Sequence, residues 1–203
     1  GGAMFGVVPK SLWERTNPAD SKNLIELGTR SLLVEDGKKL ILIDCGLGNK
    51  QDEKFFGHYS LYGDESLDKN LKKFGFVRED ITDVFLTHLH FDHCGGAIEW
   101  NDDKTGYRPA FKNAQFWTNE NHWQWATEPN PREKASFLKE NILPMQESGQ
   151  LQFLPTPKTG NYGFAPDLKM DVIFVDGHTE KQMLPVIQYQ EKTIVFAADL
   201  IPT

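Results

Sequence analysis

The sequence predicts a single α/β domain, and three observations support this. Short apolar runs typical of buried strands, at 39–43, 81–86 and 193–197, are separated by segments with the spacing of amphipathic helices. Each run ends within two residues of a histidine or an aspartate, the position at which open α/β sheets place their sites. At 203 residues, the chain is long enough to bury one sizeable core. We therefore expect one domain over 1–203.

The other elements follow from turn signals and helical spacing. Gly28 and Asp36-Gly37 separate three early strands, which predicts an antiparallel meander. Residues 66–74 have apolar side chains at helical spacing and end at Gly75, so they are predicted as a helix. Asn130-Pro131-Arg132-Glu133 combines a cap, a first-turn proline and a return glutamate, which indicates a helix to about residue 143. The predicted strands are 24–27, 31–34, 39–43, 81–86, 115–117, 151–154, 172–175, 183–189 and 193–197, and a further helix is predicted at 119–126.

One stretch holds most of the candidate chemistry. Residues 87–96 read Thr-His-Leu-His-Phe-Asp-His-Cys-Gly-Gly and contain three of the six histidines. If the chain stays extended as it leaves the preceding strand, alternate side chains share a face, so His88, His90 and Asp92 point one way. His93 breaks this period, and the two glycines allow the chain to turn. The prediction is a ligand-rich loop at the carboxyl end of a strand.

The residue types in this loop indicate a transition-metal site. Imidazole nitrogen together with carboxylate oxygen is typical of zinc, iron, manganese or cobalt, whereas calcium and magnesium sites use mainly oxygen. Four ligands within six residues are too close to converge on one ion without strain. Two adjacent ions, each taking further ligands from elsewhere in the chain, fit the spacing better. The competing interpretation is a His-rich surface loop in which Asp92 caps the following helix.

Three residues outside this loop have candidate roles. Asp44 follows an apolar strand beside Gly46 and Gly48, so its carboxylate could hold the free ring nitrogen of a metal-bound histidine. The alternative for Asp44 is a turn-capping role. His122 lies among aromatic residues on a predicted helix, which favours a core or pocket-lining position over a metal ligand. His58 is in a loop and is interpreted as a surface or substrate-lining residue.

The string His88-x-His90-x-Asp92-His93 resembles the signature of the metallo-β-lactamase superfamily, and three other landmarks occur in that family's order. They are the strand that ends in Asp44-Cys45-Gly46, the Gly177-His178-Thr179 loop, and Ala198-Asp199 after an apolar strand. The resemblance covers nearly the whole chain. It implies a four-layer αββα sandwich with a dinuclear metal site between two sheets.

Carried over residue by residue, the resemblance implies two zinc ions, with iron, manganese or cobalt as alternatives. One ion would be held by His88, His90 and His178. The other would be held by Asp92 and His93, and Asp199 would bridge the two. The family places one more histidine downstream of the bridging aspartate, and no histidine follows His178 here. We therefore expect that the C-terminal part of the domain is missing from this chain, and the alternative is an incomplete site.

Softer matches favour the branch of N-acyl-homoserine lactonases and methyl-parathion hydrolases. They lie at 4–10, 12–13, 122–127 and 198–203. This likeness implies a quorum-quenching lactonase or esterase in which a hydroxide shared by two metal ions attacks the carbonyl, with aryl esters or phosphotriesters as further substrates. Asp92 and Asp199 are the catalytic candidates. An apolar pocket is predicted from Met4, Phe5, Trp123, Trp125 and Phe164.

Composition bears on partners and location. The chain carries 29 acidic against 22 basic residues and no basic stripe, which argues against a nucleic-acid partner and leaves a small-molecule substrate. No apolar run approaches the roughly 18 residues that would span a bilayer. A soluble protein is expected, with the cytoplasm favoured over the periplasm or secretion, and a homodimer is left open. Cys45 and Cys94 are interpreted as packed thiols rather than a disulfide.

Two other functions remain as alternatives. One is a non-catalytic or mononuclear member of the fold with a binding role, which would bind a second metal weakly. The other is a di-iron oxidoreductase of the same fold. That class resembles a pattern with a carboxylate at the second histidine position, and His90 argues against it.

Overall fold

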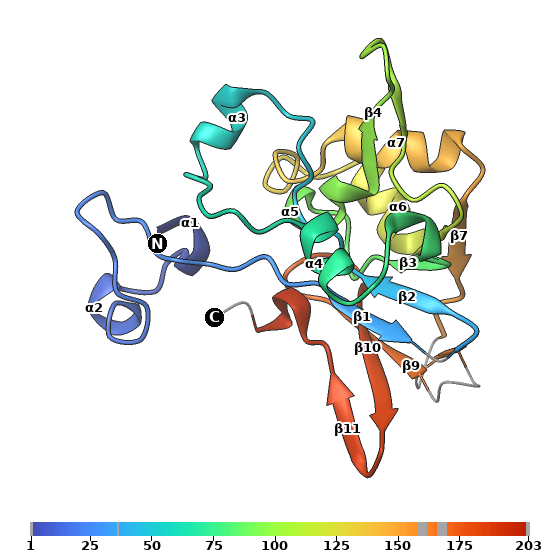
Figure 1. Cartoon of the computed structure of the whole chain (residues 1–203). Coiled ribbons are helices and arrows are strands. Elements are labelled where there is room, and N and C mark those ends of the chain that lie inside the picture. The colour runs from blue at the N-terminus through green and yellow to red at the C-terminus, as the bar shows by residue number, and fades with distance from the viewer. Residues whose placement is uncertain (1, 36, 158–161, 166–169, 202–203) are drawn as a thin grey trace.

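The computed structural model describes residues 2–35, 37–157, 162–165 and 170–201. Two β-sheets pack face to face, and helices cover the outer face of the first sheet (Figure 1). The described residues thus form three layers of the expected αββα sandwich. After the last strand they add only a short 3-10 turn, η4 (Ala198–Leu200), so a helix layer over the second sheet is not among them.

The first sheet has the strand order β1-β2-β3-β6-β7. Its strands are β1 (Leu32–Glu35), β2 (Leu40–Ile43), β3 (Asp83–Phe85), β6 (Gln115–Asn119) and β7 (Leu151–Leu154). β1 pairs antiparallel with β2, whereas β2, β3, β6 and β7 run parallel. Because parallel strands end at the same edge of a sheet, the residues that follow β2, β3 and β6 meet there.

The second sheet is antiparallel and has the order β11-β10-β9-β8. Its strands are β8 (Tyr162–Ala165), β9 (Met170–Val175), β10 (Gln182–Tyr189) and β11 (Lys192–Val195). The backbone N–H of Met183, near the start of β10, donates to the carbonyl of Thr87 at 2.8 Å. The end of β9, the start of β10 and the end of β11 therefore lie at the edge where β3 ends.

Two hydrophobic cores lie on the two faces of the first sheet, and β2 contributes to both. Leu40 and Leu42 pack in the core beneath the helices, whereas Ile41 and Ile43 pack between the sheets with residues such as Met183. Successive side chains of a strand point to opposite faces, and here both faces are covered. This explains why the strand reads as a continuous apolar run rather than an alternating one.

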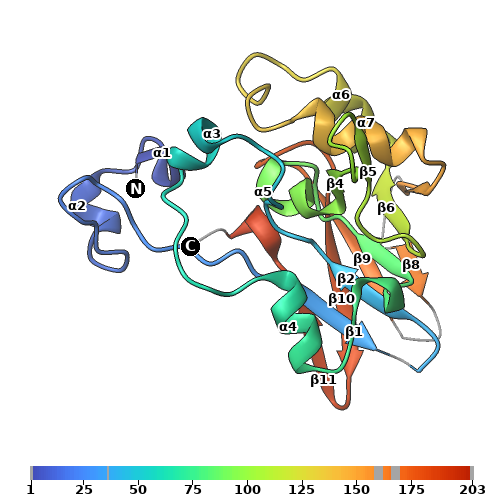
Figure 2. The same cartoon turned by 45° about the horizontal axis from the view of Figure 1, so that its top comes forward.

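The helices are short and several are capped by side chains. They are α1 (Gly2–Phe5), α2 (Lys10–Trp13), α3 (Glu53–Gly57), α4 (Leu67–Lys73), α5 (Phe91–Cys94), α6 (Glu120–Thr127) and α7 (Lys139–Glu147), with 3-10 turns η1 (Arg78–Asp80) and η2 (Gly95–Ala97). A small hairpin, β4 (Ile98–Trp100) and β5 (Tyr107–Pro109), follows η2. The segment with α1 and α2 lies to one side of the sheets (Figure 2). Across the residues that the structure describes, every helix is too short or too polar to cross a bilayer.

The structure corrects three of the predicted elements. Residues 24–27 form no strand, because the Asp20 side chain accepts the backbone N–H of Leu24 at 2.8 Å and holds a local turn. Of the antiparallel meander predicted from three early strands, only the pair β1 and β2 forms, and that pair is antiparallel as expected. The helix predicted from Asn130 begins only at Lys139. The Asn130 cap does form, with Glu133 N donating to it at 3.0 Å, but the chain continues as turns.

Candidate metal centre

The His-rich segment begins as predicted and then departs from the prediction. The chain is extended through His90, whose φ and ψ are −65° and 149°, and α5 begins at the next residue. His88 and His90 are both buried. Asp92, however, lies in the first turn of α5, so it does not continue the extended face. The cause is that His93 N and Cys94 N both donate to the His90 carbonyl at 3.0 Å, which winds the chain into a helix.

The two glycines after α5 allow a close contact between two loops. A Cβ on Gly95 would collide with the carbonyl of Leu47, and one on Gly96 would collide with the carbonyl of Cys45. The buried Lys50 ammonium contacts the carbonyl of Gly95 and that of Ile98, the latter at 3.0 Å. The His-rich segment therefore packs on the backbone of the loop that follows β2, where no side chain larger than hydrogen fits.

Asp44 holds three donors from the His-rich segment. Its Oδ1 accepts the backbone N–H of Thr87 at 2.8 Å, and its Oδ2 accepts the Thr87 hydroxyl at 2.8 Å. The same Oδ2 lies 2.8 Å from Nδ1 of His93. Because a carboxylate only accepts, Nδ1 of His93 carries the proton and Nε2 is left to face the site. Asp44 also has a φ of 55°, a conformation uncommon for a residue other than glycine, next to the site.

Thr87 sets the tautomer of His88 in the same way. The Thr87 hydroxyl donates to Asp44, so its oxygen accepts from Nδ1 of His88, 3.1 Å away. Nε2 of His88 is then unprotonated. This atom is buried and has no hydrogen-bond partner among the described residues. A buried acceptor without a donor is costly unless something electropositive faces it.

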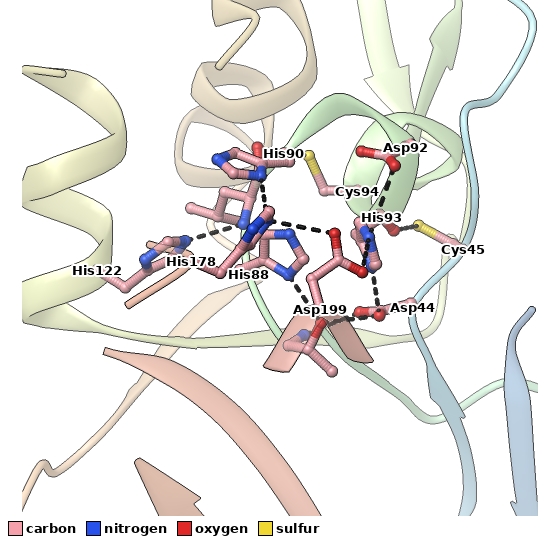
Figure 3. A network of polar contacts seen from close by, with 12 residues as sticks. Asp44, Cys45, His88, His90, Asp92, His93, Cys94, His122, His178 and Asp199 are labelled. Atoms are coloured by element: carbon pink, nitrogen blue, oxygen red, sulfur yellow. Dashed lines mark hydrogen bonds and ion pairs between the residues drawn. The ribbon is translucent and has the colours of Figure 1, made fainter. Parts of the chain in front are cut away.

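His178 and Asp199 reach the same point from the second sheet. Nε2 of His178 lies 3.0 Å from Nδ1 of His90 and 3.2 Å from Oδ2 of Asp199. The other oxygen of Asp199, Oδ1, lies 3.4 Å from Nε2 of His93. Figure 3 shows the Asp199 carboxylate between His178 on one side and His93 on the other. One oxygen of Asp199 thus faces each half of the cluster.

Two overlapping groups of donors result. His88, His90 and His178 form one group, and His88, His93 and Asp199 form the other, each with ligand atoms within 4.8 Å of one another. Converging imidazole nitrogens and a carboxylate fit a divalent transition metal such as zinc. His88 belongs to both groups, and its buried, unpartnered Nε2 supports this fit.

Comparison with known proteins decides the family. Residues 24–203 match the sequence pattern described as "Metallo-beta-lactamase superfamily", which is most of the chain. The chain belongs to the metallo-β-lactamase superfamily. Its fold is similar to a probable metal-dependent hydrolase from Staphylococcus aureus, with a TM-score of 0.83 and 28% identity over 96% of this chain and 66% of that one.

Two further proteins are similar to parts of this chain. AidC, a dizinc quorum-quenching lactonase solved with a product, matches with a TM-score of 0.60 and 25% identity over 84% of this chain and 56% of its own. The transcription termination factor FttA of Methanocaldococcus jannaschii is 33% identical over 70 residues, which are 34% of this chain and 9% of that protein. The chain therefore spans less than two thirds of the length of each of these relatives.

Burial keeps two histidines of the cluster, His88 and His90, neutral. Burial and the neighbouring histidines lower the pKa of His88 well below its ordinary value and lower that of His90 to about 3. For His93, burial acts in the same direction, but hydrogen bonds with Asp199 and Asp44 outweigh it and raise the pKa to about 10. A cation bound at Nε2 of His93 would replace that proton, because metal ligands must be deprotonated.

Asp92 is set apart from the other predicted ligands. Its Oδ2 lies 3.7 Å from Nε2 of His93, and its side chain is 36% exposed. Burial raises its pKa, and the charge of Asp199 adds to the effect while that of His93 opposes it. Asp92 therefore lies beside the second group of donors but outside the two closest groups.

His122, interpreted from the sequence as a core or pocket-lining residue, connects two loops that carry candidate ligands. Its Nε2 accepts the backbone N–H of Leu89 at 2.8 Å, and its Nδ1 lies 2.5 Å from the carbonyl of Glu180. Nδ1 must therefore carry the proton and donate it. The ring is fully buried, and burial lowers its pKa to about 4. His122 thus joins the segment between His88 and His90 to the loop that carries His178.

The five predicted pocket residues do not come together. Phe5 stacks on Trp13 with ring centroids 4.7 Å apart, in the N-terminal segment that includes Met4. Trp123 is 9% exposed and packs against Phe153. The indole of Trp125 donates to Glu133 at 3.0 Å. Phe164 is a core residue between the two sheets, because β8 places its ring against Phe85 of β3 and Trp117 of β6.

Both cysteines are buried free thiols, Cys45 in the loop after β2 and Cys94 in the His-rich segment. Burial raises the pKa of Cys94 to about 12 and that of Cys45 well above its ordinary value. The Cys45 thiol donates to the carbonyl of His93 at 3.4 Å, and the Cys94 thiol to that of Leu89 at 3.3 Å. Both act as packed thiols in the metallo-β-lactamase scaffold.

Proposed function

We propose that this chain carries the catalytic centre of a metal-dependent hydrolase that holds two divalent cations, zinc first among them, and opens a lactone or a related ester. The observation that carries the proposal is the convergence of four histidines from both sheets around the Asp199 carboxylate. The Nε2 of His88, which is buried and has no partner among the described residues, supports the same proposal.

The roles of the residues follow from their positions. His88, His90 and His178 would bind the first cation, while His93 and Asp92 would bind the second. Asp199, with one oxygen towards each group, would hold the two cations at a fixed separation. Asp44 and Thr87 keep the rings in the tautomers that leave the metal-facing nitrogens free.

The chemistry is the addition of water to an electrophilic carbonyl. Bound cations would supply Lewis acidity and lower the pKa of water towards about 7. Asp92, whose pKa burial raises, would take up the proton that the attacking water loses and deliver it to the leaving oxygen. Asp199 remains the ionised partner of His93, since its hydrogen bond to that ring outweighs burial and lowers its pKa.

A group of aromatic rings beside Asp92 supports a substrate with an apolar part. Phe91 packs against Phe55 and Tyr59 with ring centroids 5.1 and 5.0 Å apart. Tyr59 is close enough to Asp92 that burial and the charge of that carboxylate raise the tyrosine pKa. Such a wall would favour an acyl or aryl chain. An acyl-homoserine lactone fits this description, with aryl esters and phosphotriesters as further candidates, and AidC supports the choice.

The test combines metal content with turnover. The chain is loaded with zinc, freed of excess and analysed for bound metal, and acid release from an N-acyl-homoserine lactone is then followed. We expect more than one zinc per chain and lactone opening that a chelator abolishes. His88→Asn should lose both, whereas His58→Asn, at an exposed histidine outside the cluster, should keep its bound zinc. A chain that binds zinc but opens neither lactones nor esters would overturn the proposed activity.

A mononuclear binding protein is the second candidate, and one observation favours it. The two groups of donors share His88, and one imidazole nitrogen binds only one ion. If the first cation takes His88, the second is left with His93, Asp199 and the more distant Asp92. One zinc per chain without turnover would decide for this reading.

A further inference from the structure

The segment between α6 and α7 covers the outer side of His90. The ring of Phe137 packs on the His90 ring with centroids 4.7 Å apart. The carbonyl of Ser136 accepts the backbone N–H of Phe91 at 2.9 Å. This segment, 130–137, therefore holds both the ring and the adjoining backbone of one predicted metal ligand.

Glu133 is the charged residue of this segment that points inward. Its Oε2 accepts the Trp125 indole N–H at 3.0 Å and the Thr179 hydroxyl at 2.9 Å. The same oxygen lies 3.9 Å from Nε2 of His90, and the two side chains are only 16% and 8% exposed. Because Thr179 directly follows His178, one carboxylate oxygen connects the loops of two predicted ligands.

His90 leaves a nitrogen that needs an acceptor. Its Nδ1 faces Nε2 of His178 at 3.0 Å, which makes Nδ1 the metal-facing atom. The ring proton must then be on Nε2. That nitrogen is buried and has no hydrogen-bond partner in the part of the chain that the structure describes. The equivalent outward nitrogen of His93 already has a carboxylate, Asp44, at 2.8 Å.

We propose that Glu133 is the positioning residue for His90, accepting its Nε2–H and so orienting Nδ1 towards the first cation. The present separation of 3.9 Å needs to shorten by about 1 Å to reach a charge-assisted hydrogen bond. The inference rests on the proposed metal site. Under this proposal, each of two metal-facing rings is held by a carboxylate: His90 by Glu133 and His93 by Asp44.

A structural role for Glu133 is the alternative, in which its carboxylate only connects Trp125 to Thr179. The two roles make different demands. Glu133→Gln keeps an amide oxygen that can accept from Trp125 and Thr179, but it removes the charge facing His90. Trp125→Phe removes one of the connections and keeps the carboxylate. The first variant should therefore alter metal binding, and the second should alter stability.

The experiment uses cobalt(II) as the probe, on the whole chain. Affinity is measured by competition with a chromophoric chelator, and ligand geometry by the visible absorption spectrum of the bound cobalt. For Glu133→Gln we expect a loss of about 10- to 100-fold in affinity at the tighter site, with a changed spectrum. Glu133→Asp, which restores the charge with a shorter reach, should recover part of the affinity. Glu128→Gln, at an exposed carboxylate just before the segment, should match the unaltered chain.

Each outcome separates the inference from the proposed function. If the unaltered chain binds no cobalt, the metal site itself is wrong and this inference is wrong with it. If the unaltered chain binds cobalt and Glu133→Gln binds it equally well with the same spectrum, only the positioning role is overturned. An equal loss of affinity in Trp125→Phe would likewise overturn it in favour of a structural role. If circular dichroism shows that Glu133→Gln is less folded, the test depends on Glu133→Asp. A folded Glu133→Asp variant that binds cobalt no more tightly than Glu133→Gln would contradict the proposal.

Discussion

Replacing Asp44 by asparagine gives the sharpest test of how the site is held together. Asp44 accepts three hydrogen bonds, from Thr87 N, the Thr87 hydroxyl and His93 Nδ1, each at 2.8 Å. Asparagine has the same shape but only one acceptor oxygen. In its better orientation it keeps the two bonds to Oδ2 and turns its NH₂ group towards the backbone N–H of Thr87. One buried donor then loses its partner, and the other two bonds lose their charge.

The expected cost follows from these contacts. A buried hydrogen bond to a charged group contributes roughly 1.5–3 kcal/mol, and an unsatisfied buried donor costs a similar amount. We therefore expect Asp44→Asn to lower the free energy of unfolding of the metal-free chain by about 2–4 kcal/mol. In its other orientation the amide would force His93 to carry its proton on Nε2, which blocks metal binding there. Weaker binding of the second zinc should accompany the lost stability.

The assay is urea unfolding at pH 7 in the presence of a chelator, followed by zinc titration. Asp20→Asn is the matched control, because Asp20 is exposed and accepts two backbone N–H groups through a single oxygen that asparagine retains. The control should unfold at the same urea concentration as the unaltered chain. The role assigned to Asp44 would be refuted if Asp44→Asn had the same stability and the same affinity for the second zinc as the control and the unaltered chain.

Two further predictions concern His122 and Gly96. The pKa of His122 is lowered to about 4 in the folded chain, whereas an unfolded histidine titrates near 6.5. Between about pH 4 and pH 6.5 the unfolded state therefore binds more protons than the folded state. The contribution of the neutral His122 ring to the free energy of unfolding is complete above about pH 6.5 and is lost as the pH falls towards 4. Between pH 7 and pH 5 this loss amounts to about 2 kcal/mol. The free energy of unfolding is measured for metal-free His122→Asn and for the unaltered chain at pH 7 and pH 5. On acidification the variant should lose about 2 kcal/mol less than the unaltered chain. Equal losses would contradict a buried neutral ring. Gly96→Ala would push a Cβ into the carbonyl of Cys45, so we expect at least about 1–3 kcal/mol of destabilisation. Gly57→Ala, where the new Cβ meets no atom within 4 Å, should leave the melting temperature unchanged or raised, and a similar drop in both variants would argue against the close contact of the two loops.

The candidate metal ligands could be proposed from the sequence because their signal is local. His88 and His90 sit at strand spacing just beyond β3, and Asp44, His178 and Asp199 each lie within four residues of the end of a strand. Strand ends on one edge of a sheet come together whatever the details of the packing. The αββα fold and membership of the superfamily followed from the same landmarks, and the match over residues 24–203 confirms the family.

Tertiary structure alone decided which residues support those ligands. Glu133 is 43 positions from His90 in the sequence, and its local pattern predicted a helix cap. The carboxylate instead turns to Trp125 and Thr179, so the chain forms turns and α7 starts later. Nothing in the spacing around His122 indicated that its two ring nitrogens would join Leu89 to Glu180.

The division has a physical reason. By itself, the sequence predicted most of the strands, the candidate ligand types and their place at strand ends, because these depend on periodicity and on neighbours a few residues away. It could not determine Asp92's departure from the extended face, the packing of Phe164 in the core, or the contacts of Glu133. Those depend on which distant groups compete for the same hydrogen bonds and apolar surface, and that competition exists only once the two sheets have packed together.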